Sequence, residues 1–571
     1  MYKKSISLIL SVLLFISVAI PFMAFAKNSV NVFDGENTRV YNISSDNITK
    51  TLQEAFSYCD SHSDKKYTVS VPMGEYTVSS PITLCDNATL DLTDNVVLVN
   101  GKNNTNIFIG KRNVKKYNGT TNFKILGGTL TYSDDYAGSG CQIRIAHGKH
   151  ITFEKTVFQN NYNSHNVEIA ACYDVSFESC TFKNGKGNFI GNSGEALQID
   201  ILEKTKHFKD MPDYDVTMNK KITVNNCTFS NVLRGIGTSS AFAGIYQKNI
   251  KITNCRFNNI KSAAINCLNF IDSTFSNNRI TDCGEGIKYS LMMSDANLQK
   301  MNYIEGEGSP ISDCNTVISS NDISVIKTKD VSSSFGIYVF GNNITKDKNV
   351  SFKTGNYYVG NLKIKNNKIK TENFGISMYD VSNSVISGND ISGNAKSYGI
   401  RLDSDSKSNK IYNNTVRKFE HGIYLVSGNN NILKSNTLKD NRWGIYFSSG
   451  ITAYTHYNKF ASNTSNGYSA GEKKSYVFSN LAVPELSLSK NNKGVIVEWK
   501  AVKKAQYYQI YRSSSKNGTY EKTATIKSTK LKYKDTNVKK GRKYYYKVRA
   551  KRKINNIYNY SSYSDIKSIK I

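Results

Sequence analysis

The chain has 571 residues and a formal net charge of +30, from 75 Lys and Arg against 45 Asp and Glu. Residues 481–571 hold 23 Lys and Arg against 5 Asp and Glu, so +18 of this charge lies in the last sixth of the chain. A segment this basic favours a polyanion as partner, and in an exported chain we expect an anionic wall polymer or acidic glycan rather than nucleic acid. The alternative is a lysine-rich surface that only confers solubility.

Residues 1–26 have the organisation of a secretory signal peptide. Lys3 and Lys4 precede an apolar run over residues 6–20, and Ala24 and Ala26 form a small-residue cleavage pattern. No second apolar segment of membrane-spanning length follows, so we expect no membrane span. The mature protein is therefore predicted to be secreted, and extracellular or associated with the cell wall.

The first part of the mature chain carries a cap pattern and then strand patterns. Residues 51–59 have helical spacing and are expected to cover the open end of a solenoid. Residues 67–92 contain short strand patterns, with the sequence Val-Pro-x-Gly-x-Tyr in the first. This order resembles the opening of pectate-lyase-like β-helix proteins, which include polygalacturonase-type and phage-tailspike-type chains. The resemblance extends over residues 30–468 and implies the fold rather than the reaction, because this scaffold hosts many chemistries.

Coils are predicted to continue through the middle of the chain. The aligned inward residues of one sheet are expected to be Ile143, Val167, Leu197, Ile236, Ile265 and Ile287. Two long excursions interrupt these coils, over residues 203–219 and 292–313. Long loops in a compact repeat array are usually functional or disordered, so two loops near one edge suggest the walls of a groove.

A short pattern returns four times within residues 363–447, each time followed by a Gly-Ile pair. The four glycines are spaced by 24, 23 and 22 residues, and a fixed period of this size predicts a solenoid with one repeat per turn. Apolar and polar residues alternate within each repeat, which indicates strands rather than helices. Two or three strands per repeat predict a right-handed parallel β-helix with coils ~4.8 Å apart.

One turn position is predicted to form a ladder along the coil axis. It holds asparagine in four successive repeats, at Asn367, Asn389, Asn414 and Asn436. In earlier coils it holds cysteine, at Cys180, Cys227 and Cys255. We interpret the asparagines as structural and these cysteines as small buried stacking residues, although export also permits disulfides.

Residues 481–571 change to short strands and resemble a fibronectin type III domain. The resemblance implies that Trp499 is the core tryptophan, that Gly541 opens a turn, and that a tyrosine corner is made by one residue among Tyr544, Tyr545 and Tyr546. The predicted fold class is therefore all-β. A right-handed parallel β-helix with an N-terminal helical cap spans residues 30–475, and a small β-sandwich spans residues 481–571.

Outward residues of the aligned sheet give the candidate catalytic site. Glu168 and Asp200 are predicted to lie one coil apart and two residues offset, with backbones ~8 Å apart, a separation that suits inverting glycoside hydrolysis. Glu168 and Asp200 are expected to face solvent, and Glu195, which begins the strand of Asp200, is a third candidate. The candidate substrate-binding residues are Arg144, His165, Gln198, Arg234, Ser239 and Lys288. The aromatic residues expected to stack on sugars are Tyr162, Tyr173, Phe208, Tyr214 and Tyr246.

Two functions remain open at this point. The first is a carbohydrate-active enzyme, a glycosidase or lyase type that cleaves or modifies a possibly acidic polysaccharide, with a His165 or Lys288 base as a variant for a lyase or epimerase. The second is a non-catalytic glycan-binding or adhesive surface protein. The motif sets of polygalacturonases and pectate lyases are not found in the sequence. We expect no cofactor, with calcium at the carboxylates as the alternative, and no metal site at cysteines because no Cys-x-x-Cys pair is present.

Overall fold

The computed structural model describes residues 28–571, apart from 137, 139, 163, 186–193, 203–207, 209–216, 240, 242–244, 292–312, 345–354, 450, 452, 457, 470–480, 555–556 and 562. The predicted signal peptide, most of both excursions and Tyr214 lie outside the described residues. Within the described residues, no helix has both the length and the apolar character needed to cross a membrane.

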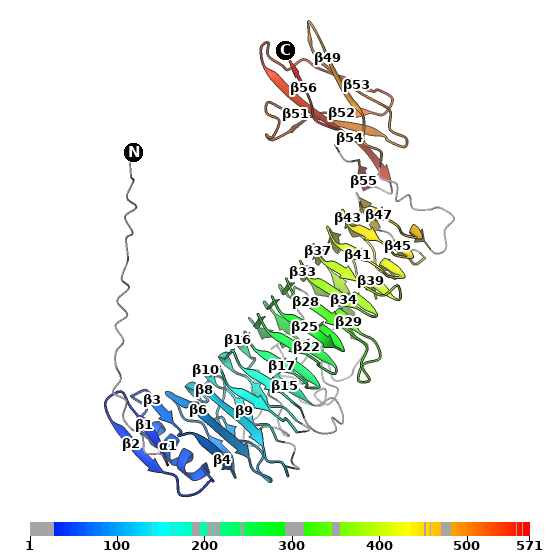
Figure 1. The fold of residues 1–571 in the computed structure, drawn as a ribbon. Helices are drawn as coiled ribbons and strands as arrows, with labels where there is room; N and C mark the ends of the chain where they lie inside the picture. Colours follow the sequence, from blue (N-terminus) through cyan, green and yellow to red (C-terminus); the bar gives the residue numbers. More distant parts are fainter. Residues whose placement is uncertain are drawn as a thin grey trace, which may run out of the picture.

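The predicted fold class is confirmed. Parallel strands stack coil on coil along one rod, from α1 (Thr49–Ser61) at one end to β47 and β48 at the other, as Figure 1 shows. One wall is a 14-stranded sheet whose strands are β5 (Ile82–Thr83), β7 (Phe108–Ile109), β9 (Ile143–Ala146), β12 (Val167–Ala170), β15 (Glu195–Asp200), β18 (Arg234–Gly237), β22 (Ala263–Leu268), β26 (Glu285–Ser290), β29 (Phe335–Phe340), β35 (Phe374–Tyr379), β39 (Tyr398–Asp403), β42 (His421–Leu425), β45 (Trp443–Phe447) and β48 (Ser465–Ser469).

The remaining walls belong to a 30-stranded sheet that bends around the coil. Its first strands are β1 (Ser29–Phe33), β2 (Thr38–Asn42), β3 (Tyr67–Ser70), β4 (Gly74–Val78), β6 (Ala88–Asn100), β8 (Thr121–Tyr132), β10 (Lys149–Glu154), β11 (Val157–Gln159), β13 (Tyr173–Glu178), β14 (Thr181–Lys183), β16 (Lys220–Asn225), β17 (Thr228–Ser230), β19 (Gln247–Lys248), β20 (Lys251–Thr253) and β21 (Arg256–Asn258). Its later strands are β23 (Phe270–Ile271), β24 (Thr274–Ser276), β25 (Arg279–Cys283), β27 (Val317–Ser319), β28 (Asp322–Val325), β33 (Lys363–Lys365), β34 (Lys368–Thr371), β37 (Val385–Ser387), β38 (Asp390–Ser392), β40 (Lys410–Tyr412), β41 (Thr415–Arg417), β43 (Asn431–Lys434), β44 (Thr437–Lys439), β46 (Ala453–His456) and β47 (Lys459–Ala461).

Two short pairs complete the rod, β30 (Asn342–Ile344) with β31 (Gly355–Tyr357) and β32 (Val359–Gly360) with β36 (Val381–Ser382). Helix α1 places Phe56 over the open end of the coil, where its ring lies 5.6 Å from that of Phe123. The helix thus covers an apolar end that would otherwise face water, as a terminal repeat of a solenoid requires.

The interior is filled by like side chains stacked on one another. The phenylalanine rings of adjacent coils lie nearly parallel, with centroids 4.6 Å apart for Phe182 and Phe229 and 4.8 Å apart for Phe229 and Phe257. The predicted inward residues of the 14-stranded sheet are in register, for example Leu197 with Ile236 and Ile265 with Ile287. The alternation in the sequence therefore identified this buried face correctly.

The predicted ladder is confirmed and is longer than the four asparagines first recognised. Side-chain amides bond from coil to coil, from Asn367 Nδ2 to Asn389 Oδ1 at 2.9 Å and from Asn389 Nδ2 to Asn414 Oδ1 at 2.8 Å. The ladder continues backward into the cysteine positions, where the backbone N–H of Cys255 donates to Asn278 Oδ1 at 2.9 Å. All ten cysteines are buried and free, so the stacking interpretation of the cysteines is confirmed.

The chain ends in two antiparallel sheets. One contains β49 (Leu486–Asn491), β50 (Gly494–Trp499) and β53 (Lys532–Asp535), and the other contains β51 (Tyr507–Ser513), β52 (Glu521–Lys527), β54 (Lys543–Ile554), β55 (Ile557–Tyr560) and β56 (Lys567–Lys570). Trp499, Tyr508 and Tyr546 lie in the core between them. Gly541 has a φ of 81° in the turn before β54, a conformation that favours glycine. The resemblance to fibronectin type III remains a prediction.

Candidate functional site

The candidate acids lie on the outer face of the 14-stranded sheet, one coil apart. In the strand register Glu168 pairs with Gln198 and Ala170 pairs with Asp200. Glu168 and Asp200 are therefore offset by one coil and two residues, as the sequence predicted. The register also places Arg144 beside Glu168, and Arg234 beside Glu195.

The first contact in this cluster is an ion pair between Glu168 and Arg144. Arg144 Nε lies 2.7 Å from Glu168 Oε2, and its Nη2 lies 3.1 Å from Cys141 Sγ. The Cys141 thiol also approaches Glu168 Oε2 at 3.4 Å, and burial raises the pKa of this thiol to about 11. The guanidinium carbon of Arg144 lies 5.6 Å from the centroid of the Phe208 ring. Arg144 is thus held between a carboxylate and an aromatic face.

Glu195 makes the second charged group of contacts. Arg234 Nη1 lies 2.7 Å from Glu195 Oε1, and His165 Nδ1 lies 3.4 Å from Glu195 Oε2. Oε2 accepts no hydrogen bond from the described residues. The side chain lies across Gly237 of the next coil, where an added Cβ would be 2.5 Å from Glu195 Cγ. A glycine at position 237 therefore leaves the space that the Glu195 side chain occupies.

Asp200 accepts hydrogen bonds from uncharged donors of two residues. The backbone N–H of Ser239 donates to Asp200 Oδ1 at 2.8 Å, and Ser239 Oγ donates to Asp200 Oδ2 at 3.0 Å. Gln198 Nε2 also donates to Asp200 Oδ2. These hydrogen bonds fix the orientation of the Asp200 carboxylate between Gln198 and Ser239.

The prediction that Glu168 and Asp200 face solvent is wrong. The exposed fractions of the candidate acids are 2% for Glu168, 0% for Glu195 and 3% for Asp200. The reason is a small apolar cluster on the outer face, made by Ala146, Ala170, Ala171, Leu202 and Phe208, which covers this part of the sheet. Strand alternation distinguishes inward from outward side chains, but it carries no information about what packs on the outer face.

Of the six predicted binding residues, five join this acid cluster and one does not. Arg144, His165, Gln198, Arg234 and Ser239 contact the candidate acids, as described above. Lys288 lies three strands away on β26, where it pairs with Glu285 at 3.5 Å and approaches the Tyr338 ring at 5.9 Å. Lys288 thus belongs to a different feature of the same sheet.

That feature is a continuous row of aromatic rings, named the aromatic strip below, which the sequence analysis missed. It runs over five coils along the outer face of the 14-stranded sheet and consists of Phe335, Tyr338, Phe340, Phe374, Tyr379, Tyr398, His421, Tyr424, Trp443 and Tyr446. Nine of these side chains are half-buried and His421 is 9% exposed. A signal for the strip is present in the sequence, because each Gly-Ile pair of these coils follows an aromatic residue or histidine.

The rings of the strip largely cover one another's faces. Phe335 and Phe374 stack at 4.7 Å with an interplanar angle of 17°, and Phe374 and Tyr398 stack at 5.5 Å with an angle of 21°. The strip therefore presents ring edges and tyrosine hydroxyls along the rod. Arg401 lies 5.3 Å from both Tyr379 and Tyr398 and pairs with Asp403. Within the described residues, Arg401 Nε, His421 Nδ1 and Ser377 Oγ on this face are buried without a hydrogen-bond partner.

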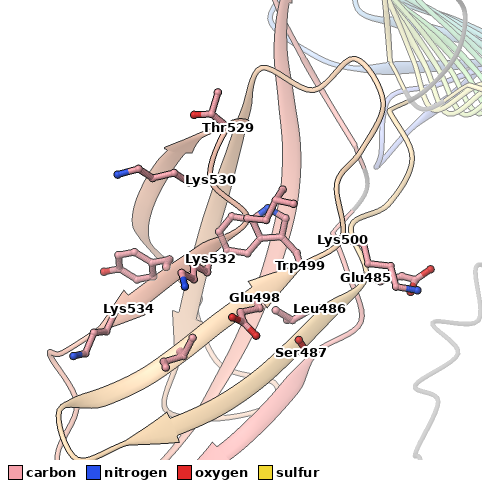
Figure 2. A pocket seen from close by; sticks show the side chains of 13 residues that line it. Glu485, Leu486, Ser487, Glu498, Trp499, Lys500, Thr529, Lys530, Lys532 and Lys534 are labelled. Atoms are coloured by element: carbon pink, nitrogen blue, oxygen red, sulfur yellow. The ribbon is translucent and has the colours of Figure 1, made fainter.

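A separate groove of about 1070 Å³ lies on the sandwich, shown in Figure 2. Its charged lining consists of Glu485, Glu498, Lys500, Lys530, Lys532 and Lys534. Glu485 and Lys500 form an ion pair at 2.6 Å, and Trp499 Nε1 is buried without a partner among the described residues. Across the described part of the chain, no cluster of three or more His, Cys, Asp or Glu side chains could hold a metal ion.

Comparisons with known proteins give partial similarities. A family model described as periplasmic copper-binding protein (NosD) matches residues 294–491. The surface adhesin PfbA of Streptococcus pneumoniae is 16% identical, over 79% of this chain and 96% of that chain, with a TM-score of 0.48. The A-module of the mannuronan C-5 epimerase AlgE4 of Azotobacter vinelandii is 14% identical, over 75% and 96%, with a TM-score of 0.35. A Fn3-like protein from Clostridium thermocellum is 33% identical, over 15% and 92%, with a TM-score of 0.14. No curated protein matches the chain.

Proposed function

We propose that this exported protein binds a polysaccharide along the outer face of the 14-stranded sheet and cleaves or modifies it at the acid cluster. The observation that carries the proposal is the shared face. In strand register the column of Glu285 continues directly into Phe335 and Phe374 of the aromatic strip, and the column of Glu168 and Gln198 continues through Gly237 and Asn266 to Lys288. A linear polymer lying along the rod would contact both features.

The strip suits a repeating ligand because it repeats with the coil. Equivalent side chains recur every ~4.8 Å along the axis, so a polymer parallel to the rod meets a similar set of ring edges and hydroxyls at each coil. Tyrosine supplies apolar area and a hydrogen-bonding hydroxyl at once. The charges in the strip are paired, Lys288 with Glu285 and Arg401 with Asp403, so the strip does not require an anionic polymer.

In the proposed reaction the three carboxylates divide the acid and base roles. Asp200, bonded by three donors, is suited to act as the base. Glu195 has one oxygen facing His165 and is placed to exchange a proton with it. Arg144 and Arg234 keep 15% and 16% of their side chains exposed, so they are the members of the cluster that an approaching sugar meets first.

A second candidate function is glycan binding without catalysis. The observation that favours it is the burial of all three carboxylates, two of which are paired with arginine. Buried ion-pair networks of this kind also occur for purely structural reasons. Under this alternative the aromatic strip alone binds the glycan. The acid cluster then has only a structural role, in which its ion pairs hold adjacent coils together.

One pair of assays separates the two functions. Purified protein is incubated with a panel of neutral and acidic polysaccharides, and both retention on the polymer and release of reducing ends or unsaturated uronate are measured. The enzyme is expected to release product, Asp200→Asn is expected to lose product release but not retention, and Tyr398→Ala with Tyr424→Ala is expected to lose retention. Retention without product across the panel supports the binding function, and absence of both contradicts the whole proposal.

The location and anchoring are proposed on the same basis. Residues 1–26 would direct export, and the basic C-terminal domain would hold the protein to an anionic polymer of the cell wall. N-terminal sequencing of the exported protein tests the first point, with Lys27 as the expected first residue. Finding the uncleaved chain inside the cell would contradict it.

A further inference from the structure

The outer face of the larger sheet of the sandwich gathers cations and tyrosines on one surface, named the basic tyrosine face below. In the β51–β54 register, Tyr507 faces Lys551, Gln509 faces Arg549 and Tyr511 faces Lys547. The β51–β52 register adds Lys527 beside Tyr507 and Lys522 beside Tyr511. Because directly opposed residues of antiparallel strands point to the same side, the cations of β52 and β54 share this face with the tyrosines of β51.

The cations on this face contact aromatic rings instead of carboxylates. Lys547 Nζ lies 4.2 Å from the centroid of Tyr563 and 4.3 Å from that of Tyr520, and the guanidinium carbon of Arg549 lies 4.1 Å from Tyr560. Among the residues that the structure describes, no carboxylate forms an ion pair with Lys522, Lys527, Lys543, Lys547 or Arg549. Within the described residues, the positive charge of these five side chains is therefore not neutralised by a carboxylate.

On the opposite side of the same strands, the cation has a carboxylate partner within the domain. Arg512 on β51 pairs with Asp535 at 2.9 Å, and Tyr546 on β54 donates to the same carboxylate at 2.8 Å. The cation of the inner side thus has its counter-ion within the domain. In the described part of this sheet, the outer face thus carries Lys522, Lys527, Lys543, Lys547 and Arg549 without a carboxylate partner.

We propose that the basic tyrosine face binds an acidic polysaccharide, a polymer that carries carboxylate groups on its sugar rings. Lys543, Lys547 and Arg549 lie on one side of β54 and span ~20 Å, which suits a linear polyanion. The guanidinium of Arg549 can bind a carboxylate in two-pronged fashion, and the interleaved tyrosines supply edges and hydroxyls for the sugar rings. This inference rests on the proposed anchoring by the basic C-terminal domain and names the surface and the class of polymer for it, a surface separate from the acid cluster and the aromatic strip.

The lysine-lined groove of Figure 2 serves as the control surface in the test of this proposal. It carries Lys530, Lys532 and Lys534 on the other sheet, but Glu485 and Glu498 line it as well. Removing three lysines there changes the net charge of the domain by the same amount as removing the three cations of β54. The two sets therefore separate a specific face from a general effect of charge.

The test measures binding of the full chain to immobilised polygalacturonate. The triple variant Lys543→Gln, Lys547→Gln and Arg549→Gln is expected to bind at least about tenfold more weakly, since each cation near an anionic surface contributes about a fivefold effect. The matched variant Lys530→Gln, Lys532→Gln and Lys534→Gln is expected to bind within about twofold of the wild type. Thermal melting of both variants serves as the check that each has folded.

Three outcomes overturn the proposal. Equal loss of binding in the two triple variants would show a general charge effect, and a larger loss in the groove variant would move the site to the other sheet. Binding of inorganic polyphosphate as tight as that of polygalacturonate would remove the role of the sugar rings. Loss of polygalacturonate binding in the β54 variant, with product release from a neutral polysaccharide unchanged, separates this surface from the proposed catalytic function.

Discussion

At the scale of single residues, Glu195 is the most completely buried charge among the three candidate acids. Its exposed fraction is 0% and its counter-ion is Arg234, at 2.7 Å. A buried charge that loses its partner is far more costly than an exposed one, because the desolvation penalty remains while the attraction is gone. The stability of this coil should therefore depend on the pair and not on either residue alone.

The first prediction concerns this pair. Arg234→Gln is expected to lower the free energy of unfolding by about 3–5 kcal/mol, because it leaves the Glu195 carboxylate buried without its cation. Arg442→Gln is the control, since Arg442 pairs with Glu420 at 3.1 Å with side chains 62% and 39% exposed. That change is expected to cost less than about 1 kcal/mol. Urea unfolding at pH 7 measures both, and equal costs would show that the Glu195 pair is solvated.

The second prediction concerns Asp380, which is 8% exposed. Burial, followed by the nearby charges of Asp405 and Asp403, raises its pKa to about 6. The folded protein thus holds a proton that the unfolded chain releases near pH 4, so this residue lowers stability as pH rises from about 4 to about 6. Asp380→Asn is expected to raise the free energy of unfolding by about 1–2 kcal/mol at pH 7 and to change it little at pH 4. A variant with the same effect at both pH values would contradict the assigned pKa.

The pairing of the acids could be predicted from the sequence, but their environment could not. Alignment of the inward residues Val167 and Leu197 was enough to place Glu168 and Asp200 on adjacent coils, which the register confirms. The cover made by Leu202 and Phe208 comes from residues without strand periodicity. The partner of Lys288 was not foreseen either, and it is Glu285, three residues earlier on the same strand.

At the scale of elements, the asparagine ladder joins each coil from Asn278 to Asn458 to the next. Asn414 is 1% exposed, donates from Nδ2 to Ile386 O at 2.9 Å and to Asn436 Oδ1 at 3.0 Å, and accepts from Asn389 Nδ2 at 2.8 Å. Removing this side chain leaves buried donors and acceptors on both neighbouring coils without partners. The cost of such unpaired groups exceeds the modest net value of each hydrogen bond.

The third prediction follows from this geometry. Asn414→Ala is expected to lower the free energy of unfolding by about 3 kcal/mol. Asn394→Ala is the matched control, because Asn394 is exposed and accepts a single bond, from the N–H of Lys396 at 3.3 Å. The control is expected to change stability by less than about 0.5 kcal/mol. Similar losses in the two variants would mean that the ladder adds nothing beyond local turn formation.

The sequence contains a repeated pattern that predicts the aromatic strip, but the predicted sugar-binding residues did not include these positions. Candidate sugar-binding aromatics were sought near the long excursions, whereas the strip lies on the regular coils, where Phe335, Phe374 and Tyr398 each precede a Gly-Ile pair. Phe335 and Phe374 are paired in the strand register, and Tyr398 holds the equivalent position on the next coil, where Ile376 pairs with Ile400. A search for equivalent exposed positions across repeats would have found the strip without a structure.

At the scale of the whole molecule, the fold class could be predicted because both parts repeat simple patterns. Alternation with a period near 23 residues specifies the β-helix, and short strands around Trp499 specify the sandwich. The sequence did not show that the basic C-terminal segment divides its charge between two sheets of different character. That division depends on which strands pair, and the pairing of β51 with both β52 and β54 is a property of the tertiary structure.

The last prediction concerns the ten cysteines, which are distributed along the rod and are all buried and free. Burial raises the pKa of Cys172 to about 12 and that of Cys283 to about 12, and a thiol reacts as its thiolate. All ten sulfurs are buried, so a thiol reagent cannot reach them in the folded protein. The native protein is therefore expected to react at fewer than about one site at pH 8, and at all ten sites in concentrated guanidinium chloride. Because the coils hold the sulfurs by packing rather than by disulfides, reductant should leave the melting temperature unchanged. Rapid labelling of several thiols in the native state would contradict this prediction. So would a measured mass that is lower by two hydrogen atoms for each disulfide bridge.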